Sequence, residues 1–127
     1  MITQFTSHQV KGKGRGKFLG YPTINLLPPD NFDLKDGIYA VWVTISGTIF
    51  RGAMHWGPIP TFEDDQAKSL EVFLLGLEGQ DLSNTDLSRV AIDVKERLRD
   101  ILKFNSINDL IAQIDKDVLE VRRILTD

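Results

Sequence analysis

The spacing of apolar residues changes once along this chain, near residue 100, and this change constrains the fold more than any other feature. Up to residue 95, apolar and β-branched residues form short runs separated by turns that contain glycine or proline, without a helical period. From residue 107 to residue 125, apolar side chains recur every three or four positions, as on one face of an α-helix. Successive strands without intervening helices predict an antiparallel barrel or sandwich, with one long C-terminal helix packed across it.

Six segments have the composition of strands. The run over 37–46 is the clearest, because it is rich in β-branched and aromatic residues and ends in a glycine turn typical of a hairpin. Residues 57–62 contain two prolines, so they cannot form a regular central strand. Ser106 is expected to cap the helix, with Asp109 three residues later. The expected strands are 4–11, 23–27, 37–46, 49–56, 69–77 and 87–94.

The composition bounds the classes of protein that this chain can form. Its 127 residues suit one compact domain, which we expect to span residues 1–127. The absence of cysteine and the presence of only two histidines exclude disulfides, thiol catalysis and zinc sites built from thiolates or several histidines. A net charge of −3 argues against a general nucleic-acid binder. Without a signal peptide or a membrane-spanning run, we expect a cytoplasmic monomer with neither a membrane nor a nucleic acid as partner.

Positive charge is concentrated near the N-terminus. Residues 1–29 carry four basic and no acidic side chains, whereas the remaining 98 residues carry 11 basic and 18 acidic ones. Glycine leaves backbone N–H groups bare, so cations interleaved with glycines can bind a compact anion such as a phosphate. The pattern is neither a Walker A loop nor a Rossmann fingerprint, and a solvated surface loop can have the same composition. The segment consists of Lys11, Gly12, Lys13, Gly14, Arg15, Gly16 and Lys17.

Two polar residues follow this loop at the spacing of a strand. Thr23 and Asn25 are two positions apart, so their side chains lie on one face while Ile24 points to the other. A hydroxyl and an amide oxygen are ligands that Mg²⁺ accepts, with water and substrate phosphates completing its coordination. The alternative is that both residues lie on the solvated face of an amphipathic strand.

One acidic residue lies within a strongly apolar run. Glu71 is the only acid in Ser-Leu-Glu-Val-Phe-Leu-Leu, residues 69–75. A glutamate held in a cavity can act as a general base, because burial moves its pKa toward the working range. A solvent-facing glutamate on the same strand would have no such role, and its position alone does not decide between the two.

These residues together resemble the start of the riboflavin kinase domain. In that family a G-x-G-R-G loop runs into L-G-F-P-T-A-N, and residues 12–25 of this chain read Gly-Lys-Gly-Arg-Gly-Lys-Phe-Leu-Gly-Tyr-Pro-Thr-Ile-Asn. The Pro-Thr-x-Asn element after the glycine loop is the specific part. The resemblance covers nearly the whole chain in order. It continues at 36–41, 57–62, 69–72, Leu98-Arg99, Lys103-Phe104, 110–114 and Asp117.

The resemblance implies a fold, an activity and a set of site residues. The fold is mostly β with one C-terminal α-helix, its strands closed into a small antiparallel Greek-key barrel. The activity is Mg²⁺-dependent transfer of the ATP γ-phosphoryl group to the ribityl 5′-hydroxyl of riboflavin, which gives FMN and ADP. Glu71 would be the catalytic base, and Arg99 would lie on the flavin side. Thr23 and Asn25 would hold the metal. The implied ATP-binding residues are Gly12, Gly14, Arg15, Gly16, Lys17 and Thr23.

Several positions depart from the family pattern, and most of them fall on the side expected to bind the flavin. His55 stands where the family has asparagine, and Phe73 stands where it has histidine. Gly76 and Ile101 replace acidic residues, and Ser83-Asn84 replaces Tyr-Gly. These changes leave two alternatives open. One is a flavin- or nucleotide-binding module without turnover, and the other is a kinase for a different small hydroxyl compound. FAD synthesis is not expected, because the chain lacks a His-x-Gly-His motif.

Overall fold

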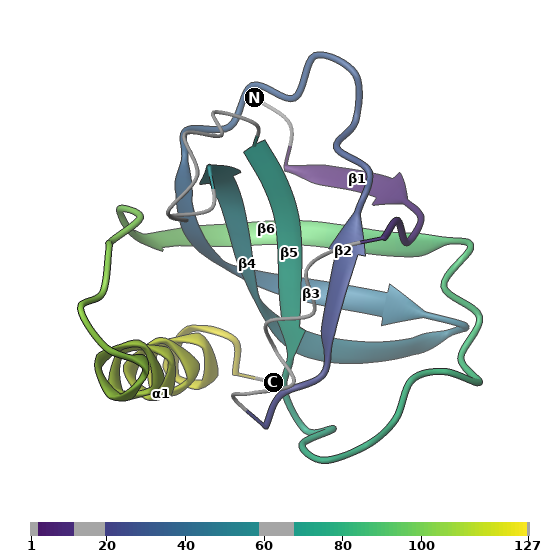
Figure 1. Ribbon diagram of the computed structural model, residues 1–127. Helices are drawn as coiled ribbons and strands as arrows, with labels where there is room; N and C mark the ends of the chain where they lie inside the picture. Colours follow the sequence, from purple (N-terminus) through teal and green to yellow (C-terminus); the bar gives the residue numbers. More distant parts are fainter. Residues whose placement is uncertain (1–2, 12–19, 59–67, 127) are drawn as a thin grey trace.

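The computed structural model describes residues 3–11, 20–58 and 68–126, which form one six-stranded sheet and one helix (Figure 1). The expected order of strands and helix is confirmed. β1 and β5 end earlier than expected, β6 begins and ends further along the chain, and β4 continues through Gly57 and Pro58, which were not expected in a strand. The elements are β1 (Gln4–Ser7), β2 (Thr23–Leu26), β3 (Gly37–Ile45), β4 (Thr48–Pro58), β5 (Lys68–Leu74), β6 (Val90–Arg99) and α1 (Ile107–Ile124).

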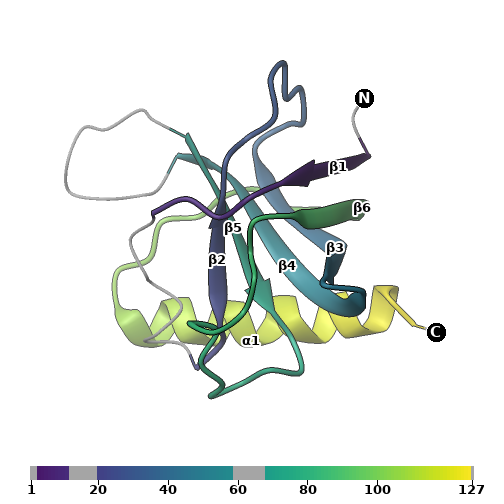
Figure 2. The same ribbon diagram turned by 90° about the vertical axis from the view of Figure 1, so that its right-hand side faces the viewer.

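The strands pair in the order β1-β6-β3-β4-β5-β2, and every pair is antiparallel. β3, β4 and β5 are neighbours in sequence and in the sheet, and β6 returns to lie on the other side of β3. This is the strand order of a Greek key. The sheet is strongly curled, so that β1 and β2 at its two edges approach each other (Figures 1 and 2).

The closed barrel expected from the resemblance is not formed, and the sheet is a curled half-barrel with a seam between its edges. β1 pairs with β6 over Gln4–Ser7, and only the residues after it reach β2. There, a single bridge joins Gln9 to Leu26, flanked by bonds from Val10 N to Asn25 O (2.8 Å) and from Leu27 N to His8 O (3.1 Å). The seam has no continuous ladder, because the segment that starts with β1 pairs first with β6 and only afterwards with β2.

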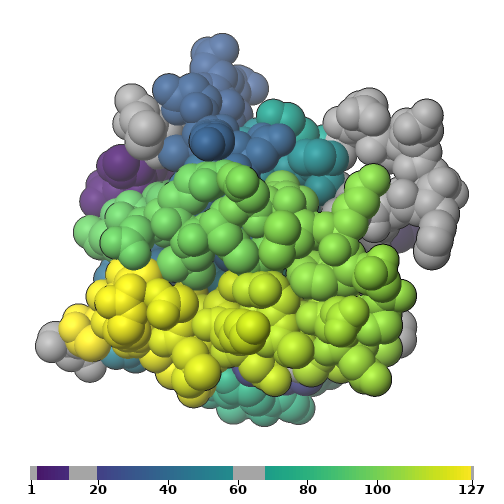
Figure 3. Space-filling view, turned by 90° about the vertical axis from the view of Figure 1, so that its left-hand side faces the viewer, coloured from purple at the N-terminus to yellow at the C-terminus, as the bar shows by residue number. Residues whose placement is uncertain are grey.

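The two faces of the sheet bury separate apolar clusters, as the alternation of side chains along a strand requires. The concave face holds the larger cluster, with Ile24, Met54 and Val72 fully buried. The convex face is covered by α1, which lies along one side of the sheet in Figure 2 and forms a continuous band in Figure 3. The sheet side of this second cluster includes Ala40 and Ala53, whose small side chains let the helix approach closely.

The helix begins where its cap was expected. The Ser106 side chain accepts a hydrogen bond of 3.1 Å from the backbone N–H of Asp109, which satisfies one of the unpaired donors at the first turn. Val118 and Val121 are buried against the sheet. Within residues 3–11, 20–58 and 68–126, no helix is long and apolar enough to cross a membrane.

Candidate functional site

Three polar side chains from three neighbouring strands lie in one row on the convex face. Asn25 of β2 is paired with Glu71 of β5, and Glu71 is paired with His55 of β4. Residues directly opposite each other in antiparallel strands point to the same face, with Cβ atoms about 4.5–5.5 Å apart. The row continues through Ile38 of β3 to Arg99 of β6. Strand register alone therefore gathers residues that are up to 74 positions apart in the sequence.

Burial differs along this row. Glu71 is 0% exposed and His55 is 5% exposed, whereas Asn25 is half-buried. Burial of an ionisable carboxyl group is costly, and carboxylates are rarely buried without a structural or functional reason. The structure therefore decides between the two alternatives that the sequence left open, because Glu71 is buried and does not face solvent. Its role as a base stays a prediction.

Thr23 precedes Asn25 by two positions on β2, so its side chain lies on the same face. It is paired with Phe73, and its side chain is half-buried. Its hydroxyl donates a hydrogen bond to the carbonyl oxygen of Tyr21 at 3.4 Å, which leaves the lone pairs of Oγ1 to accept or coordinate. Together with the amide oxygen of Asn25, this oxygen forms a neutral donor set of the kind that Mg²⁺ accepts alongside phosphates. The two residues thus fit the metal that the resemblance implies.

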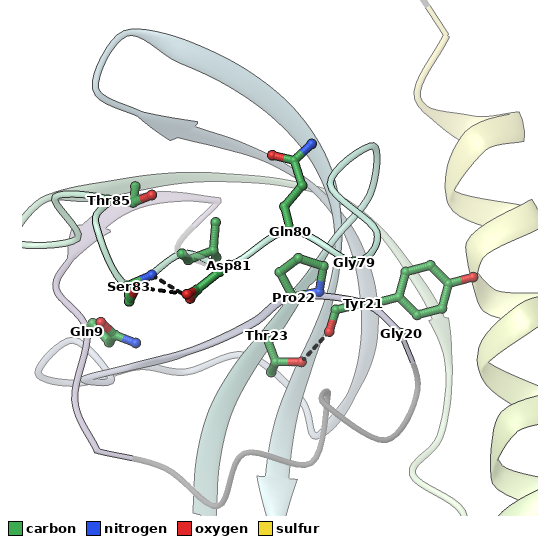
Figure 4. Close-up of a pocket in the computed structure, with 11 residues that line it drawn as sticks. Gln9, Gly20, Tyr21, Pro22, Thr23, Gly79, Gln80, Asp81, Ser83 and Thr85 are labelled. Atoms are coloured by element: carbon green, nitrogen blue, oxygen red, sulfur yellow. Dashed lines mark hydrogen bonds between the residues drawn. The ribbon is translucent and has the colours of Figure 1, made fainter.

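A pocket of about 420 Å³ adjoins Thr23 (Figure 4). One wall is the segment Gly20–Thr23, and the opposite wall is the turn that follows β5. The two walls are joined by a hydrogen bond of 3.2 Å from Gly79 N to Gly20 O. The lining combines apolar surface with polar side chains, as ligand pockets generally do. The lining residues are Gln9, Gly20, Tyr21, Pro22, Thr23, Gly79, Gln80, Asp81, Leu82, Ser83 and Thr85.

The far wall of this pocket was missed by the sequence analysis, which noted Ser83 only as a departure. In the structure the Asp81 carboxylate accepts hydrogen bonds of 2.9 Å from both the backbone N–H and the hydroxyl of Ser83. This local turn shapes the wall. An Asp-x-Ser spacing, which favours such side-chain-to-backbone turns, was the available signal.

Tyr21 connects the near wall to the helix. Its ring points away from the pocket in Figure 4, and its hydroxyl lies 3.5 Å from Oδ1 of Asp115. Burial raises the pKa of the Tyr21 hydroxyl, and the carboxylates of Asp115 and Glu78 raise it further. The phenol therefore stays protonated at neutral pH and serves as a donor toward α1.

Arg99, at the end of the row, is bound to the helix. Its Nε and Nη2 donate hydrogen bonds of 2.9 Å and 2.7 Å to the two carboxylate oxygens of Asp117. Gln113 donates another to the same carboxylate at 3.1 Å, and Nη1 of Arg99 donates to the carbonyl oxygen of Asp100. This bidentate ion pair holds α1 beside β6. The resemblance implied a place for Arg99 on the flavin side and did not pair it with Asp117.

The departures from the family pattern have distinct surroundings. Phe73 belongs to the apolar cluster beneath α1. Ile101 lies over Gly57, so closely that a Cβ atom at that glycine would overlap its Cδ1. Gly76 has a φ of +86°, in the region where glycine is favoured over an acidic residue. Each replacement therefore has a packing or backbone reason of its own.

The expected phosphate loop lies outside the described residues, which exclude 12–19, so Gly12, Gly14, Arg15, Gly16 and Lys17 stay predicted ATP contacts. In the described parts of the chain, no group of three or more His, Cys, Asp or Glu side chains could hold a metal ion. A metal here would therefore rely on neutral oxygens such as those of Thr23 and Asn25, with phosphates as further ligands.

Comparison with known proteins identifies the family. The riboflavin kinase (flavokinase) family model matches residues 2–125. This chain therefore belongs to the riboflavin kinase family, as its motifs suggested. A solved structure described as a macrolide-efflux protein from Streptococcus pneumoniae has a TM-score of 0.77 and 31% sequence identity. The similarity covers 97% of this chain and 39% of that one.

The curated relatives are longer proteins. A bifunctional riboflavin kinase/FMN adenylyltransferase from Listeria monocytogenes is 33% identical over 114 residues, which are 89% of this chain and 35% of the relative. An RNA-binding riboflavin kinase, RibR, from Bacillus subtilis is 31% identical over 109 residues, which are 86% of this chain and 45% of the relative. This chain thus spans between one third and one half of the length of these relatives.

Proposed function

We propose that this chain is a riboflavin kinase, which transfers the γ-phosphoryl group of ATP to the ribityl 5′-hydroxyl of riboflavin and releases FMN and ADP. Membership of the family supports the reaction class. The observation that carries the proposal is the shared face of Thr23, Asn25 and Glu71, with the carboxyl group fully buried between polar neighbours. This arrangement has the parts that phosphoryl transfer needs, which are alignment, charge neutralisation and a proton acceptor.

In the proposed reaction, Glu71 accepts the proton of the ribityl hydroxyl. The hydroxyl oxygen forms a bond to the γ-phosphorus while the bond from that phosphorus to the β–γ bridging oxygen breaks, and ADP leaves with the electron pair. Thr23 and Asn25 hold the metal end of the nucleotide through their neutral oxygens. When bound, Mg²⁺ supplies positive charge that offsets the charge on the phosphates. The sheet keeps these groups in register before substrate arrives.

The two substrates are assigned to opposite ends of the polar row. The pocket beside Thr23 is suited to the nucleoside part of ATP, since it combines apolar surface with hydrogen-bonding side chains and adjoins the proposed metal ligands. The glycine loop at 12–17 would close over the phosphates. Riboflavin would then lie on the far side of Glu71, toward Arg99, which is the last residue of the row. Arg99 would act there while it is held by Asp117.

The decisive experiment is an assay of the purified chain with riboflavin and MgATP, with FMN detected chromatographically. We expect FMN formation that requires a divalent metal, and a sharp loss in Asn25→Ala, because that variant removes one proposed metal ligand. Thr44→Ala is a suitable control on β3, away from the proposed site. Absence of FMN across a range of divalent metals would contradict the proposal.

A second candidate is a module that binds flavin or nucleotide without turnover. The replacement of polar family residues by Phe73, which packs in the cluster beneath α1, and by Ile101, which lies over Gly57, favours it. Quenching of riboflavin fluorescence on binding, without phosphate transfer, would select this candidate. Phosphorylation of another hydroxyl compound in preference to riboflavin would select a kinase of different specificity.

We also propose that the chain is a monomer. Elution of the active species from a size-exclusion column at the mass of two chains would contradict this.

A further inference from the structure

We propose that α1 holds both walls of the pocket beside Thr23 in place through a closed ring of contacts, and that this ring strengthens the binding of nucleotide there. The inference rests on the proposed function, in which this pocket takes the nucleoside part of ATP. It gives the polar surface of α1 a role in positioning the pocket walls. Three links make up the ring, one from each wall to the helix and one between the walls.

The first link joins the near wall to the helix. Tyr21 belongs to the wall segment Gly20–Thr23, and its ring packs against the apolar cluster beneath α1. Its hydroxyl donates a hydrogen bond of 3.5 Å to Oδ1 of Asp115 on α1. In Figure 4 the ring is directed toward the helix and away from the pocket. The family motif L-G-F-P-T-A-N has phenylalanine at this position, so the hydroxyl is a feature of this chain and not of the motif.

The second link joins the two walls to each other. The backbone N–H of Gly79, in the far wall, donates a hydrogen bond of 3.2 Å to the carbonyl oxygen of Gly20, in the near wall. The near wall is also bonded to the sheet, because the carbonyl oxygen of Pro22 accepts a hydrogen bond of 2.9 Å from Leu74 N at the end of β5. Since the walls are bonded to each other, a shift of one wall moves the other.

The third link joins the far wall to the helix. Nη2 of Arg122 on α1 lies 3.5 Å from Oε1 of Glu78. The same oxygen accepts a hydrogen bond of 3.2 Å from the backbone N–H of Gly76, so Glu78 holds the turn from which the far wall continues. The side chains of Arg122 and Glu78 are 53% and 42% exposed. A partly exposed ion pair of this kind contributes little by itself.

The links close because the two helix residues share one face. Asp115 and Arg122 are seven positions apart on α1, which is about two helical turns. Burial raises the pKa of the Tyr21 hydroxyl, Asp115 and Glu78 raise it further, and Arg122 lowers it, so all three charges act on this hydroxyl. Side-chain networks can contribute more than their separate contacts suggest, because the opening of one contact leaves the others in place.

The position of these walls matters for the proposed reaction. Thr23, a proposed metal ligand, is the last residue of the near wall, and its hydroxyl donates a hydrogen bond of 3.4 Å to the carbonyl oxygen of Tyr21. Movement of the near wall would therefore displace both the pocket lining and this ligand. A site that is already ordered binds its ligand more tightly, because less conformational freedom is lost on binding. Riboflavin, assigned to the other end of the polar row, should be little affected.

The test compares two neighbouring arginines and the two tyrosines of the chain. In Arg122→Gln and in Tyr21→Phe we expect the KM for MgATP to rise about threefold, while kcat and the KM for riboflavin stay within about twofold. Arg123→Gln is the matched control for the first variant, because Arg123 pairs with Glu120 of the same helix. Tyr39→Phe is the control for the second, because the Tyr39 hydroxyl donates to a carbonyl oxygen outside the pocket lining. Neither control should change the KM for MgATP.

The double variant Tyr21→Phe/Arg122→Gln tests whether the links act as one ring. Each single variant leaves the bonded walls attached to α1 by the other polar link, and the double variant keeps neither. We therefore expect the KM for MgATP to rise by more than the product of the two single effects. A rise equal to that product would show two independent contacts and overturn the ring.

The outcomes separate this inference from the proposed function. FMN formation by the parent chain, with an unchanged KM for MgATP in Arg122→Gln and Tyr21→Phe, would overturn the inference and leave the kinase proposal intact. An equal rise of this KM in Arg123→Gln would show a general effect of helix charge and would also overturn it. Absence of FMN formation by the parent chain would instead contradict the proposed function.

A second measurement needs no turnover. The amide hydrogen of Gly79 is bonded across the two walls, so its exchange rate reports how often the walls separate. We expect its protection to fall about threefold in Arg122→Gln and in Tyr21→Phe, and to stay unchanged in Arg123→Gln. Equal protection in the parent chain and all three variants would overturn the inference, whether or not the chain is active.

Discussion

At the scale of single residues, Glu71 combines full burial with a carboxyl group within the apolar part of β5, residues 70–74. Neighbouring strands supply Asn25 and His55 at the paired positions. An ionisable group in such a place lowers stability unless its partners offset the desolvation. Proteins keep groups of this kind at functional sites, where the cost to stability is balanced by activity.

This cost can be measured in Glu71→Gln. We expect FMN formation to fall by about 10²–10⁴-fold, as for removal of a well-placed base. The thermal midpoint should stay the same or rise, because a neutral amide of the same shape is cheaper to bury. An activity assay gives the rate of FMN formation, and calorimetry on the same preparation gives the thermal midpoint. A midpoint lowered by several degrees would mean that Glu71 is a structural residue.

Arg99 and Asp117 give a second prediction about residues. Their side chains are 18% and 5% exposed, and the guanidinium binds both carboxylate oxygens. In Asp117→Asn we expect the free energy of unfolding to fall by about 3 kcal/mol, because a largely buried cation loses its counter-charge. Urea denaturation measures this change. Glu120→Gln is the matched control, since its partner Arg123 lies on the exposed side of the same helix, and it should cause no measurable change.

At the scale of elements, the end of β6 carries an ion pair between Arg97 and Asp100, and we expect its contribution to folding stability to be lost in acid. The side-chain hydrogen bond from Arg97 at 2.6 Å holds the pKa of Asp100 below its usual value of 3.8. The folded state therefore releases this proton more readily than the unfolded state. The resulting stabilisation is present above pH 3.8 and is lost as the pH falls through the lower folded-state value.

The corresponding prediction compares unfolding at neutral and acidic pH. Asp100→Asn should lower the stability at neutral pH and should show a weaker loss of stability than the parent chain as the pH drops below about 4. Chemical denaturation at a series of pH values gives both quantities. Parallel curves for the two proteins would contradict the contribution of this pair.

The observed ends of the helix and the strands also show which features local sequence patterns can predict. The helix begins at the cap predicted from Ser106, since capping depends on residues within one turn. The end of β6 was predicted at residue 94 but lies at Arg99. Its second half contains Lys95, Glu96 and Arg97, which do not alternate as a half-buried strand would. It is held as a strand by pairing with β3, across two irregularities of register. Such pairing is a tertiary property.

At the scale of the whole molecule, the seam between the sheet edges has far fewer backbone hydrogen bonds than the centre of the described sheet. β3 is paired along its length with both β4 and β6. The backbone contacts at the seam are instead the bridge between Gln9 and Leu26 and the two hydrogen bonds that flank it. Segments with few ladder hydrogen bonds open at lower free energy than the centre of a sheet.

Hydrogen exchange tests this difference. We expect the amide hydrogens of Val10 and Leu27, which cross the seam, to exchange much faster than those of Val41 and Val43 in the centre of β3. Exchange followed by NMR under native conditions gives the protection of each amide. Equal protection at the seam and in β3 would show that the edges behave as a continuous ladder.

The sequence by itself determined the kinds of elements and their order, because apolar period, turn residues and caps act over a few neighbouring positions. It also placed Thr23 and Asn25 on one face, since strand alternation is local. Only the tertiary structure decided that Glu71 is buried between Asn25 and His55. The tertiary structure likewise left the sheet open at its seam and bound Arg99 to Asp117. These outcomes depend on which strands and helix pack together, and contacts between distant parts of the chain are not encoded in local spacing.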